Sequence, residues 1–435
     1  MAGDMWGSRK AFVFAAIGSA VGLGNVWRFP YIASENGGVW FLVPYAVCII
    51  LVGLPLLLLE TGQGLQNRRN LVESAVRSMG AHFPGRAGRL ALGAFPVFVS
   101  TVIMAYYAAI CAWTLWFAFE FALGATPTFG AMQKEYSPLA AFAVVFAGGY
   151  FIAAKGAHRG IEPVTNWLVP ALFLILALLF AYALALPGAL AYLEGTFSTG
   201  AEKLLEPRTW YYALSQVLFS LSVGYGIMFT YATSLRSGRG LISSSLQIAG
   251  ADTAASVLAF LTITILASSL GNSAGGMALS FEALPVFFAG GGWAGVAAGV
   301  GFFLLLFFAA FTSYLSMLEH TLVSTKSLNP GWKAAVAICT LAIGAVSVLS
   351  YSPLGLQAFG KPVLDLLDFA FGTVLAPFSA LALTAVCAYL LPTAGLARRM
   401  GLPEWGRGAF DFAIKKAVPA ALLALIAVSL AFGLY

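Results

Sequence analysis

The sequence predicts an all-α membrane protein with about eleven membrane-spanning helices, and three observations lead to that prediction. Hydrophobic residues make up 60% of the 435 residues and charged residues 9%, with a mean hydropathy of +0.89. A soluble domain is roughly 45–50% apolar and about 25% charged. The apolar residues form long segments, and at roughly 30 residues per span with its connection, about eleven to twelve spans fit. Glycines interrupt two of these segments, which indicates broken helices.

Short polar connections between the apolar segments set the boundaries of the predicted spans. The spans lie at about 9–33, 39–66, 89–122, 138–154, 162–186, 209–236, 241–270, 293–325, 333–349, 362–391 and 410–434. We expect a single transmembrane domain over 1–435, with a first repeat at about 9–186, a second at about 209–391 and an extra helix at about 410–434. No cleavable signal is expected, because a short N-terminus leads straight into an apolar segment.

Lysine and arginine are concentrated in the connections on one side of the predicted bilayer. That side also carries Arg9 and Lys10, and it is cytoplasmic by the positive-inside rule. Its connections contain Arg68, Arg69, Arg77, Arg86, Arg89, Lys155, Arg159, Arg236, Arg239, Lys326, Lys333, Arg398, Arg399, Arg407, Lys415 and Lys416. The N-terminus is therefore expected inside the cell and, after an odd number of spans, the C-terminus outside.

Composition and spacing exclude several classes of function. The net charge of +6 is spread over short connections, so nucleic-acid binding is not expected. The four cysteines stand singly in apolar runs and the three histidines are isolated, which predicts neither disulfides nor a zinc site. The sequence has no HExxH, no GxSxG and no paired histidine and acid within one span, so we expect no enzyme.

The first span contains the stretch on which the functional prediction depends. It reads S-A-V-G-L-G-N-V-W-R-F-P from Ser19 to Pro30. Glycines at its centre, followed by Asn25, Arg28 and a proline, predict that the helix is unwound there. Freed backbone groups at membrane depth need polar partners, which indicates a site for a cation and a small zwitterion. The alternative is a kink that eases helix packing.

The sixth span repeats this pattern. Val223-Gly224-Tyr225-Gly226 matches the V-G-x-G of the first span at Val21. Interrupted helices that open each of two five-helix halves are typical of inverted repeats with a binding site at their interface.

Oxygen-bearing side chains in other spans are candidates to bind Na⁺, which prefers hard ligands. Thr312 and Ser313 lie about one turn beyond the Ala309 carbonyl, although such hydroxyls usually bond back to their own helix. A second candidate set combines Asn25, Ser220 and Asp252, and Asp252 is an isolated carboxylate in an apolar span.

Arg28 and Asp368 are two further charges at membrane depth. A direct or water-bridged pair between them would form a gate across a narrow pathway, and a fixed structural salt bridge is the alternative.

Motifs along the whole chain carry a resemblance to a known family. They are Trp6-Gly7-Ser8-Arg9, the stretch from Gly18 to Pro30, Glu35-Asn36-Gly37-Gly38, L-P-L-L-L-L-E ending at Glu60, A-Y-Y at Ala105, Q-V-L-F-S-L-S-V-G-Y-G at Gln216, T-S at Thr312 and L-D-F at Leu367. With them the sequence resembles the neurotransmitter:sodium symporter family, in its bacterial amino-acid transporter branch, and lacks only a twelfth helix. The resemblance implies the leucine-transporter fold, with five plus five inverted helices and Na⁺-coupled alternating access.

The resemblance also implies two sodium sites and a substrate site. One Na⁺ would bind the Ala20 carbonyl, Asn25, Ser220, Asp252 and the substrate carboxylate; the other would bind the carbonyls of Gly18, Val21 and Ala309 and the hydroxyls of Thr312 and Ser313. The amides of Leu23 and Gly24 and the Tyr107 hydroxyl would hold the substrate carboxylate, and the carbonyls of Ala20 and Phe219 with Ser222 its ammonium. The side-chain pocket would be formed by Ile103, Ile110, Phe219, Tyr225 and Met317. The substrate set also includes Ser220 and Ser313, which are shared with the sodium sites. Phe219 and Tyr107 would form an inner lid and Arg28 with Asp368 the outer gate.

Departures from the family pattern lead to further expectations. Monoamine carriers have an aspartate where this chain has Gly22, so an α-amino acid with its own carboxylate is expected, with an apolar or aromatic side chain. Asp252 replaces the usual asparagine beside Tyr45, Gln216, Ser220 and Ser256, which resemble a chloride-binding set. A fixed carboxylate there can replace the anion's charge and can titrate, so transport is expected to be chloride-independent.

The family's cytoplasmic gate is missing from this sequence. Gly3, Ser327 and Ser234 occupy the positions of its arginine, aspartate and tyrosine. Either Asp4 pairs with a base such as Lys326, or the inner gate is weak and the inward-facing state is more populated.

Together these observations predict a sodium-coupled importer of a neutral L-amino acid in the cytoplasmic membrane, as a monomer or homodimer. No organic cofactor is expected. The alternative is a non-transporting amino-acid sensor or channel on the same fold.

Overall fold

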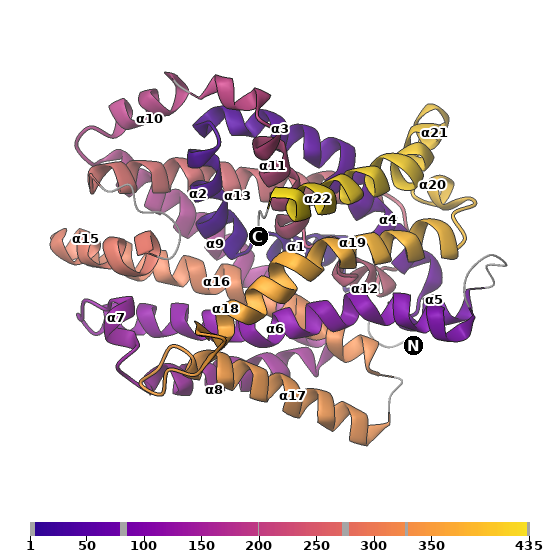
Figure 1. The fold of residues 1–435 in the computed structure, drawn as a ribbon, viewed down its shortest axis with the longest axis horizontal. Helices are drawn as coiled ribbons and strands as arrows, with labels where there is room; N and C mark the ends of the chain where they lie inside the picture. Colours follow the sequence, from indigo (N-terminus) through magenta and orange to yellow (C-terminus); the bar gives the residue numbers. More distant parts are fainter. Residues whose placement is uncertain (1–4, 79–84, 199, 272–277, 327–328, 433–435) are drawn as a thin grey trace.

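The structure is a computed structural model, and it describes residues 5–78, 85–198, 200–271, 278–326 and 329–432. Long helices run in roughly the same direction across Figure 1 and pack side by side. A short antiparallel hairpin, in which Gln357 pairs with Pro362, provides the two β-strands of the described residues. The predicted all-α membrane fold is confirmed.

Among the described residues, the first half of the chain contains nine α-helices and several shorter helical turns that adjoin them. Its elements are α1 (Arg9–Ala20), η1 (Gly24–Arg28), α2 (Phe29–Glu35), η2 (Gly38–Phe41), α3 (Leu42–Cys48), η3 (Ile49–Gly53), α4 (Leu54–Asn67), α5 (Leu71–Arg77), α6 (Arg86–Ala122), α7 (Phe129–Met132), α8 (Ser137–Ala153), η4 (Ala157–Ile161) and α9 (Glu162–Leu184). Two elements, α10 (Ala189–Ser198) and η5 (Ala201–Leu205), then lead to the second half.

The second half begins at α11. Its elements are α11 (Pro207–Ser220), α12 (Ile227–Thr233), α13 (Leu241–Ser269), η6 (Leu279–Ala283), α15 (Leu284–Gly290), α16 (Gly292–Ser324), α17 (Pro330–Leu349), β1 (Gln357–Ala358), β2 (Lys361–Pro362), α18 (Val363–Leu367), η7 (Asp368–Val374), α19 (Leu375–Ala385), η8 (Val386–Leu390), α20 (Leu396–Arg399), α21 (Glu404–Phe412), η9 (Ala413–Ala417) and α22 (Val418–Phe432).

Among the described residues, eight helices are long and apolar enough to cross a membrane, or up to nine when the bent pair at the N-terminus is one span. The sequence predicts eleven spans. The fourth predicted span is α8, which has only 17 residues. The sixth is divided into α11 and α12, which have 14 and 7 residues. Neither of these two predicted spans contains a single helix that is long enough to cross a membrane.

Helix α6 lies at the centre of the bundle. Within its most apolar stretch 78% of the residues are buried, against 22% in α17 at the periphery. Helix α16 packs along α6, while α8 and α17 cover the other side of α6 in Figure 1. Both α6 and α16 therefore present side chains to the protein interior, where the candidate site lies.

The first span is broken, as predicted. Helix α1 ends at Ala20, Val21 has an extended backbone (φ −76°, ψ 93°), and helical structure resumes at Gly24. The two helical parts, Arg9–Ala20 and Gly24–Glu35, differ in direction by 47°. The Val21 N–H still donates to the Ile17 carbonyl, whereas the N–H groups of Gly22 and Leu23 bond to side chains outside the regular helical ladder.

The second predicted break is also confirmed. Between α11 and α12, Ser222, Gly224 and Gly226 have φ angles of +51°, +93° and +87°. Glycine adopts this left-handed region without the steric penalty that a Cβ atom imposes. At Gly224 a Cβ atom would also lie 2.6 Å from the Cβ of Ala380, so both the backbone angle and the packing require glycine.

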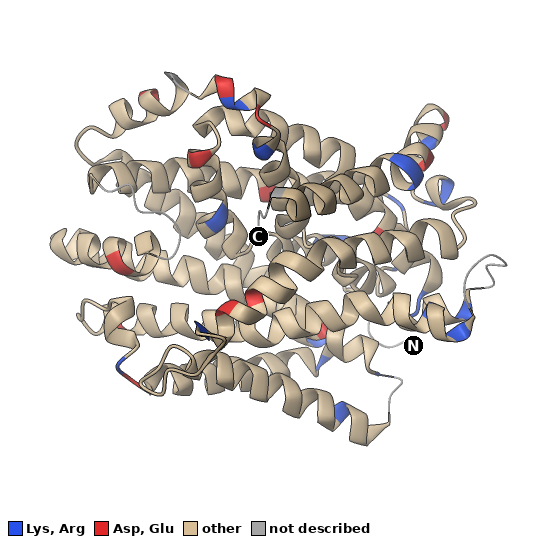
Figure 2. Ribbon diagram, viewed as in Figure 1, with Lys and Arg blue, Asp and Glu red and all other residues tan. Residues whose placement is uncertain are grey.

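Basic residues gather at one end of the bundle. Figure 2 shows most lysines and arginines at the end that carries α5, α20 and α21, and acidic residues are more frequent at the opposite end. The connections that the sequence predicts to be cytoplasmic thus share one end of the molecule.

Candidate functional site

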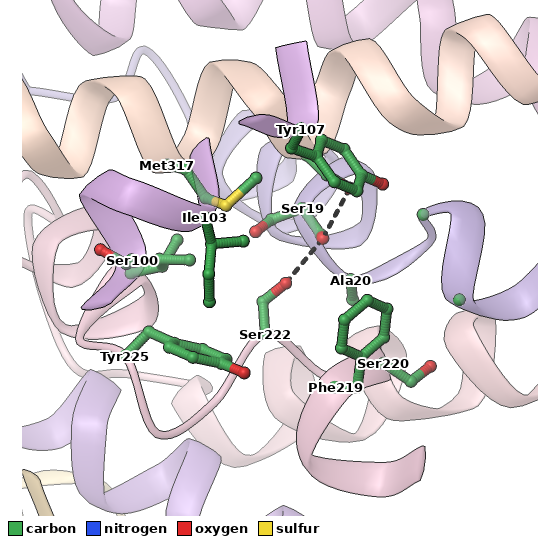
Figure 3. A pocket seen from close by; sticks show the side chains of 14 residues that line it. Ser19, Ala20, Ser100, Ile103, Tyr107, Phe219, Ser220, Ser222, Tyr225 and Met317 are labelled. Carbon is green, nitrogen blue, oxygen red and sulfur yellow. Dashed lines mark hydrogen bonds between the residues drawn. The ribbon is translucent and has the colours of Figure 1, made fainter. Parts of the chain in front are cut away.

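The two helix breaks line a common cavity near the middle of the molecule (Figure 3). Its volume is about 50 Å³, above the roughly 10–15 Å³ that one water molecule requires. Side chains and backbone from α1, the two breaks, α6, α11, α12 and α16 surround it. The lining residues are Ser19, Ala20, Gly22, Gly24, Ser100, Ile103, Tyr107, Phe219, Ser220, Ser222, Tyr225, Ile227, Ser313 and Met317.

Most of the predicted substrate-binding residues therefore meet at this cavity. Leu23 and Ile110 are buried but do not line it. Ser19, Ser100, Gly22 and Ile227 line the cavity although the substrate prediction did not include them. Their positions next to predicted residues, such as Ser100 one helical turn before Ile103 on α6, are the sequence signal that could have found them.

At the first break, polar side chains bind the freed backbone amides. The Tyr107 hydroxyl accepts a hydrogen bond from the Leu23 N–H at 3.3 Å. The Asn25 Oδ1 atom accepts one from the Gly22 N–H at 2.9 Å. Backbone donors at membrane depth are thus directed at oxygen atoms beside the cavity, and such donors can bind an anionic group.

At the second break, a hydroxyl links the two broken spans. Ser222 donates a hydrogen bond to the Ser19 carbonyl at 2.7 Å, as Figure 3 shows. The left-handed backbone of Ser222 turns its side chain toward α1. The two breaks are therefore joined by a hydrogen bond beside the cavity.

Glu60 holds the second break from the other side. Its Oε1 atom accepts a hydrogen bond from the Gly224 N–H at 2.6 Å, and Ser379 donates to the Gly224 carbonyl at 2.7 Å. Glu60 is fully buried on α4. The sequence places Glu60 in the L-P-L-L-L-L-E motif and predicts no role for its carboxylate. The rule applied to Asp252, that a carboxylate at membrane depth is functional, would also have identified it.

The predicted oxygen ligands on α16 face the first broken span. The Ser313 hydroxyl lies 3.5 Å from the Gly18 carbonyl, 3.1 Å from the Ser19 carbonyl and 3.1 Å from the Ala309 carbonyl. Thr312 bonds back to the Phe308 carbonyl at 2.8 Å, as hydroxyls in membrane helices commonly do.

This region is rich in hard oxygen atoms from two helices. Such a donor set suits Na⁺ by its chemistry, and Gly18, Val21, Ala309, Thr312 and Ser313 are the residues that would hold the ion.

The second candidate cluster surrounds Asp252, which is fully buried on α13. Its Oδ1 atom accepts hydrogen bonds from the Asn25 side-chain amide at 2.7 Å and from the Ser220 hydroxyl at 2.6 Å. Its Oδ2 atom accepts one from the Tyr45 hydroxyl at 3.0 Å. The Asn25 amide also donates to the Ser256 hydroxyl at 2.8 Å. A buried carboxylate is thus satisfied by three donors, as its charge requires.

Gln216 does not join the Asp252 cluster, although the sequence groups it with a chloride-like set. It donates to the Gly24 carbonyl at 3.0 Å and accepts from Arg28 at 2.6 Å.

Arg28 and Asp368, both among the described residues, form no ion pair with each other. Arg28 donates to Gln216 and, at 3.0 Å, to Ser215, and its guanidinium lies 5.6 Å from the Phe219 ring centroid. Asp368 accepts a hydrogen bond from the Tyr106 hydroxyl at 2.9 Å. The fixed salt bridge and the direct pair are therefore not formed in this structure, because each charge has other partners.

At the basic end of the molecule, the segment before α1 is hydrogen-bonded to the end of α12. The buried Trp6 side chain donates to the Tyr231 carbonyl at 2.8 Å, and its backbone N–H donates to the Ser234 carbonyl at 3.1 Å. Arg68 donates to the carbonyls of Thr233 and Leu235 at the end of α12. Ser234 thus contributes a backbone carbonyl at the position where the family has a tyrosine.

Glu162 provides a further contact to this segment. Its Oε2 atom accepts the Gly7 N–H at 2.9 Å and lies 2.8 Å from Nδ1 of His158. Three residues of the predicted inner gate lie outside the described ranges: Gly3, Asp4 and Ser327. Of the predicted alternative pair, only Lys326 is among the described residues.

Comparison with known proteins identifies the family. A model of the sodium:neurotransmitter symporter family matches residues 3–127 and 128–393. The chain belongs to this family. The uncharacterized sodium-dependent transporter YhdH of Bacillus subtilis is 31% identical over 396 residues, which is 86% of this chain and 85% of that protein. The human sodium-dependent neutral amino acid transporter SLC6A17 is 26% identical over 268 residues, which is 52% of this chain and 36% of that protein.

A solved structure extends the similarity to the whole fold. The crystal structure of MhsT in complex with L-phenylalanine matches with a TM-score of 0.84 and 29% identity, and it covers 98% of this chain and 99% of that chain. The predicted family is therefore confirmed, and this chain is a multi-pass membrane protein of a sodium-dependent transporter family.

Proposed function

We propose that this symporter-family protein couples the inward movement of Na⁺ to the import of a neutral L-amino acid with an apolar or aromatic side chain. The observation that carries this proposal is the cavity between the two helix breaks, where peptide groups that leave the helical ladder lie beside side-chain hydroxyl and amide oxygens. The co-crystallised L-phenylalanine of MhsT and the neutral amino acid transport named for SLC6A17 support the substrate class.

The substrate carboxylate binds at the first break. The amides of Leu23 and Gly24 and the Tyr107 hydroxyl supply donors, and Gly22 leaves room because its missing Cβ would lie 2.7 Å from the Ser313 hydroxyl. The substrate ammonium binds at the second break, where Ser222 and the carbonyls of Ala20 and Phe219 supply oxygen atoms. The two breaks thereby recognise both charges of an amino acid.

Two sodium sites adjoin this pocket. The first uses the Ala20 carbonyl, Asn25, Ser220, Asp252 and the substrate carboxylate, and the second uses the oxygen atoms of α1 and α16 described above. When bound, each Na⁺ supplies positive charge that stabilises the opposing oxygen dipoles. Because the substrate carboxylate completes the first sodium shell, each ligand raises the affinity of the other by the same factor.

Asp252 makes transport independent of chloride in this proposal. Its carboxylate provides, within the Tyr45, Ser220 and Ser256 cluster, the negative charge that an anion would otherwise supply. The three hydrogen-bond donors support an ionised carboxylate at this buried point.

Transport proceeds by alternating access to the cavity. On the outer side, Arg28 and Asp368 are separate and each can exchange its present partner for the other, which would close a gate above Phe219 and Tyr107. On the inner side, the contacts of Trp6, Gly7 and Arg68 close the pathway and must be released for inward opening.

The two five-helix repeats and the extra C-terminal helix form one domain in the cytoplasmic membrane in this proposal. The N-terminus lies inside the cell and the C-terminus outside, which is supported by the gathering of basic residues at one end of the bundle. The functional unit is a monomer or a homodimer.

Gradient-driven uptake into proteoliposomes tests the proposal. We expect labelled L-phenylalanine to accumulate when a Na⁺ gradient is imposed and not when K⁺ replaces Na⁺. A binding screen of the twenty amino acids in Na⁺ and in K⁺ should give sodium-dependent binding of neutral apolar or aromatic ones. Sodium-dependent binding without gradient-driven accumulation would contradict transport and favour a sensor.

A further inference from the structure

Tyr225 differs from the other polar residues that line the cavity. Figure 3 shows its ring along one wall with the hydroxyl directed into the cavity. The side chain is 8% exposed. Among the described residues, no atom forms a hydrogen bond with this hydroxyl.

The other hydroxyls of the cavity all have partners. Ser19 donates to Ser316 at 2.8 Å, Ser100 to the Val97 carbonyl at 3.2 Å, and Ser220 to Asp252 at 2.6 Å. The hydroxyls of Tyr107, Ser222 and Ser313 bond to the broken first span, as described above. The Tyr225 hydroxyl is therefore the lining side-chain group, among the described residues, that is left for a ligand.

A ligand that fills the cavity displaces water from this hydroxyl, and a hydroxyl that is then left without a partner is unfavourable. A bound molecule with a polar atom in this part of the cavity would remove that cost. An entirely apolar side chain would leave the cost in place, since Ile103 and Met317 provide only apolar contacts beside Tyr225.

We propose that Tyr225 selects amino acids whose aromatic side chain carries a hydrogen-bonding group, as the phenol of tyrosine and the indole N–H of tryptophan do. The hydroxyl can donate to a phenol oxygen and can accept from an indole N–H, so both substrates fit. Ile103 and Met317 cover the apolar part of the ring. This inference rests on the proposed function and narrows its substrate class.

Matched ligands that differ by one polar group test the selection. Binding of L-tyrosine is compared with that of 4-methyl-L-phenylalanine, which has a methyl group in place of the hydroxyl, in the purified full-length protein with Na⁺. We expect the wild-type protein to bind tyrosine about 2- to 10-fold more tightly, the range that one neutral hydrogen bond provides. In Tyr225→Phe this ratio should fall to about one, while the affinity for L-phenylalanine stays within twofold or improves.

Tyr150→Phe is the control variant. It removes the same atom from a tyrosine of α8 that bonds to Thr340 away from the cavity, and it should leave the ratio unchanged.

Two results would overturn the inference. One is an unchanged ratio in Tyr225→Phe. The other is an equal loss of affinity for tyrosine, 4-methylphenylalanine and phenylalanine, which would mean that the hydroxyl acts on the fold or on an outer gate. Sodium-dependent binding of phenylalanine in either case keeps the proposed function intact, whereas absence of sodium-dependent binding of any amino acid to the wild-type protein contradicts the proposed function itself.

Discussion

Replacing Asp252 with asparagine removes one buried negative charge and keeps the shape of the side chain. Asp252 accepts a hydrogen bond from the Asn25 amide at 2.7 Å, and both residues belong to the proposed first sodium site. Even at a charge separation on the order of 6 Å, which is longer than direct coordination would give, an effective dielectric constant of about 20 makes the attraction about 3 kcal/mol. This corresponds to about 150-fold in affinity.

We therefore expect Asp252→Asn to lose most sodium-dependent uptake in chloride-free medium. Chloride should restore it, because Tyr45, Ser220 and Ser256 can then direct their donors at an anion. The assay is uptake into proteoliposomes driven by a Na⁺ gradient, with chloride or gluconate as the anion. Wild-type uptake should be equal in both anions.

A second variant separates charge from local shape. Ser256 lies one turn beyond Asp252 on α13, and its hydroxyl is 2.8 Å from the Asn25 amide. Asp252→Asn combined with Ser256→Asp should recover chloride-free uptake. If Asp252→Asn alone is as active as wild type without chloride, or if it folds normally and chloride never restores it, the charge-replacement reasoning is wrong.

Three further substitutions test the first helix break, the proposed sodium ligand on α16 and the contacts of the N-terminal segment. Gly22→Ala should lower sodium-dependent amino-acid affinity more than 10-fold in a binding assay, because its Cβ would lie 2.7 Å from the Ser313 hydroxyl, whereas Gly148→Ala, with open space around it, should have no effect. Ser313→Ala should raise the Na⁺ concentration for half-maximal uptake several-fold, and an unchanged Na⁺ dependence would exclude Ser313 as a ligand. Gly7→Ala should displace Glu162, since the added Cβ would lie 2.7 Å from Oε1 of Glu162. The displacement should increase the labelling of a cysteine introduced on α12 in Na⁺-free medium. Equal labelling would show that this contact does not hold the N-terminal segment at the basic end of the molecule.

The sequence predicted the two helix breaks because their cause is local. Glycines at Gly224 and Gly226 allow backbone angles that other residues avoid, and both occur in the segment expected to unwind. Buried polar residues in apolar runs were equally visible, and Asn25, Ser220 and Asp252 do meet in one hydrogen-bonded cluster.

Partner choice among long side chains was less predictable. Arg28 has both Gln216 and Asp368 within the same region of the fold, and its hydrogen bonds go to Gln216 and Ser215. The inner end depends on contacts between the N-terminal segment and residues far along the chain, such as Glu162 with Gly7. Sequence spacing does not encode such contacts, because flexible side chains and backbone amides select partners only after the helices have packed.

The hydrogen bonds provide a route by which the proposed second sodium site can act on the proposed substrate site. The Ser19 carbonyl accepts from Ser222 of the second break and from Ser313 of α16. A cation that binds the Ser313 oxygen requires the Ser313 O–H to turn away from the Ser19 carbonyl. Ser222 is then the remaining side-chain donor to that carbonyl. The change would be confined to one acceptor shared by three segments, so a cation bound at α16 would alter the hydrogen bonding beside the cavity without a large movement of any helix. Coupling between the two sites can thus arise from one shared peptide oxygen, and its strength is bounded by the roughly 0.5–1.5 kcal/mol of a single hydrogen bond, which is about 2- to 10-fold in affinity.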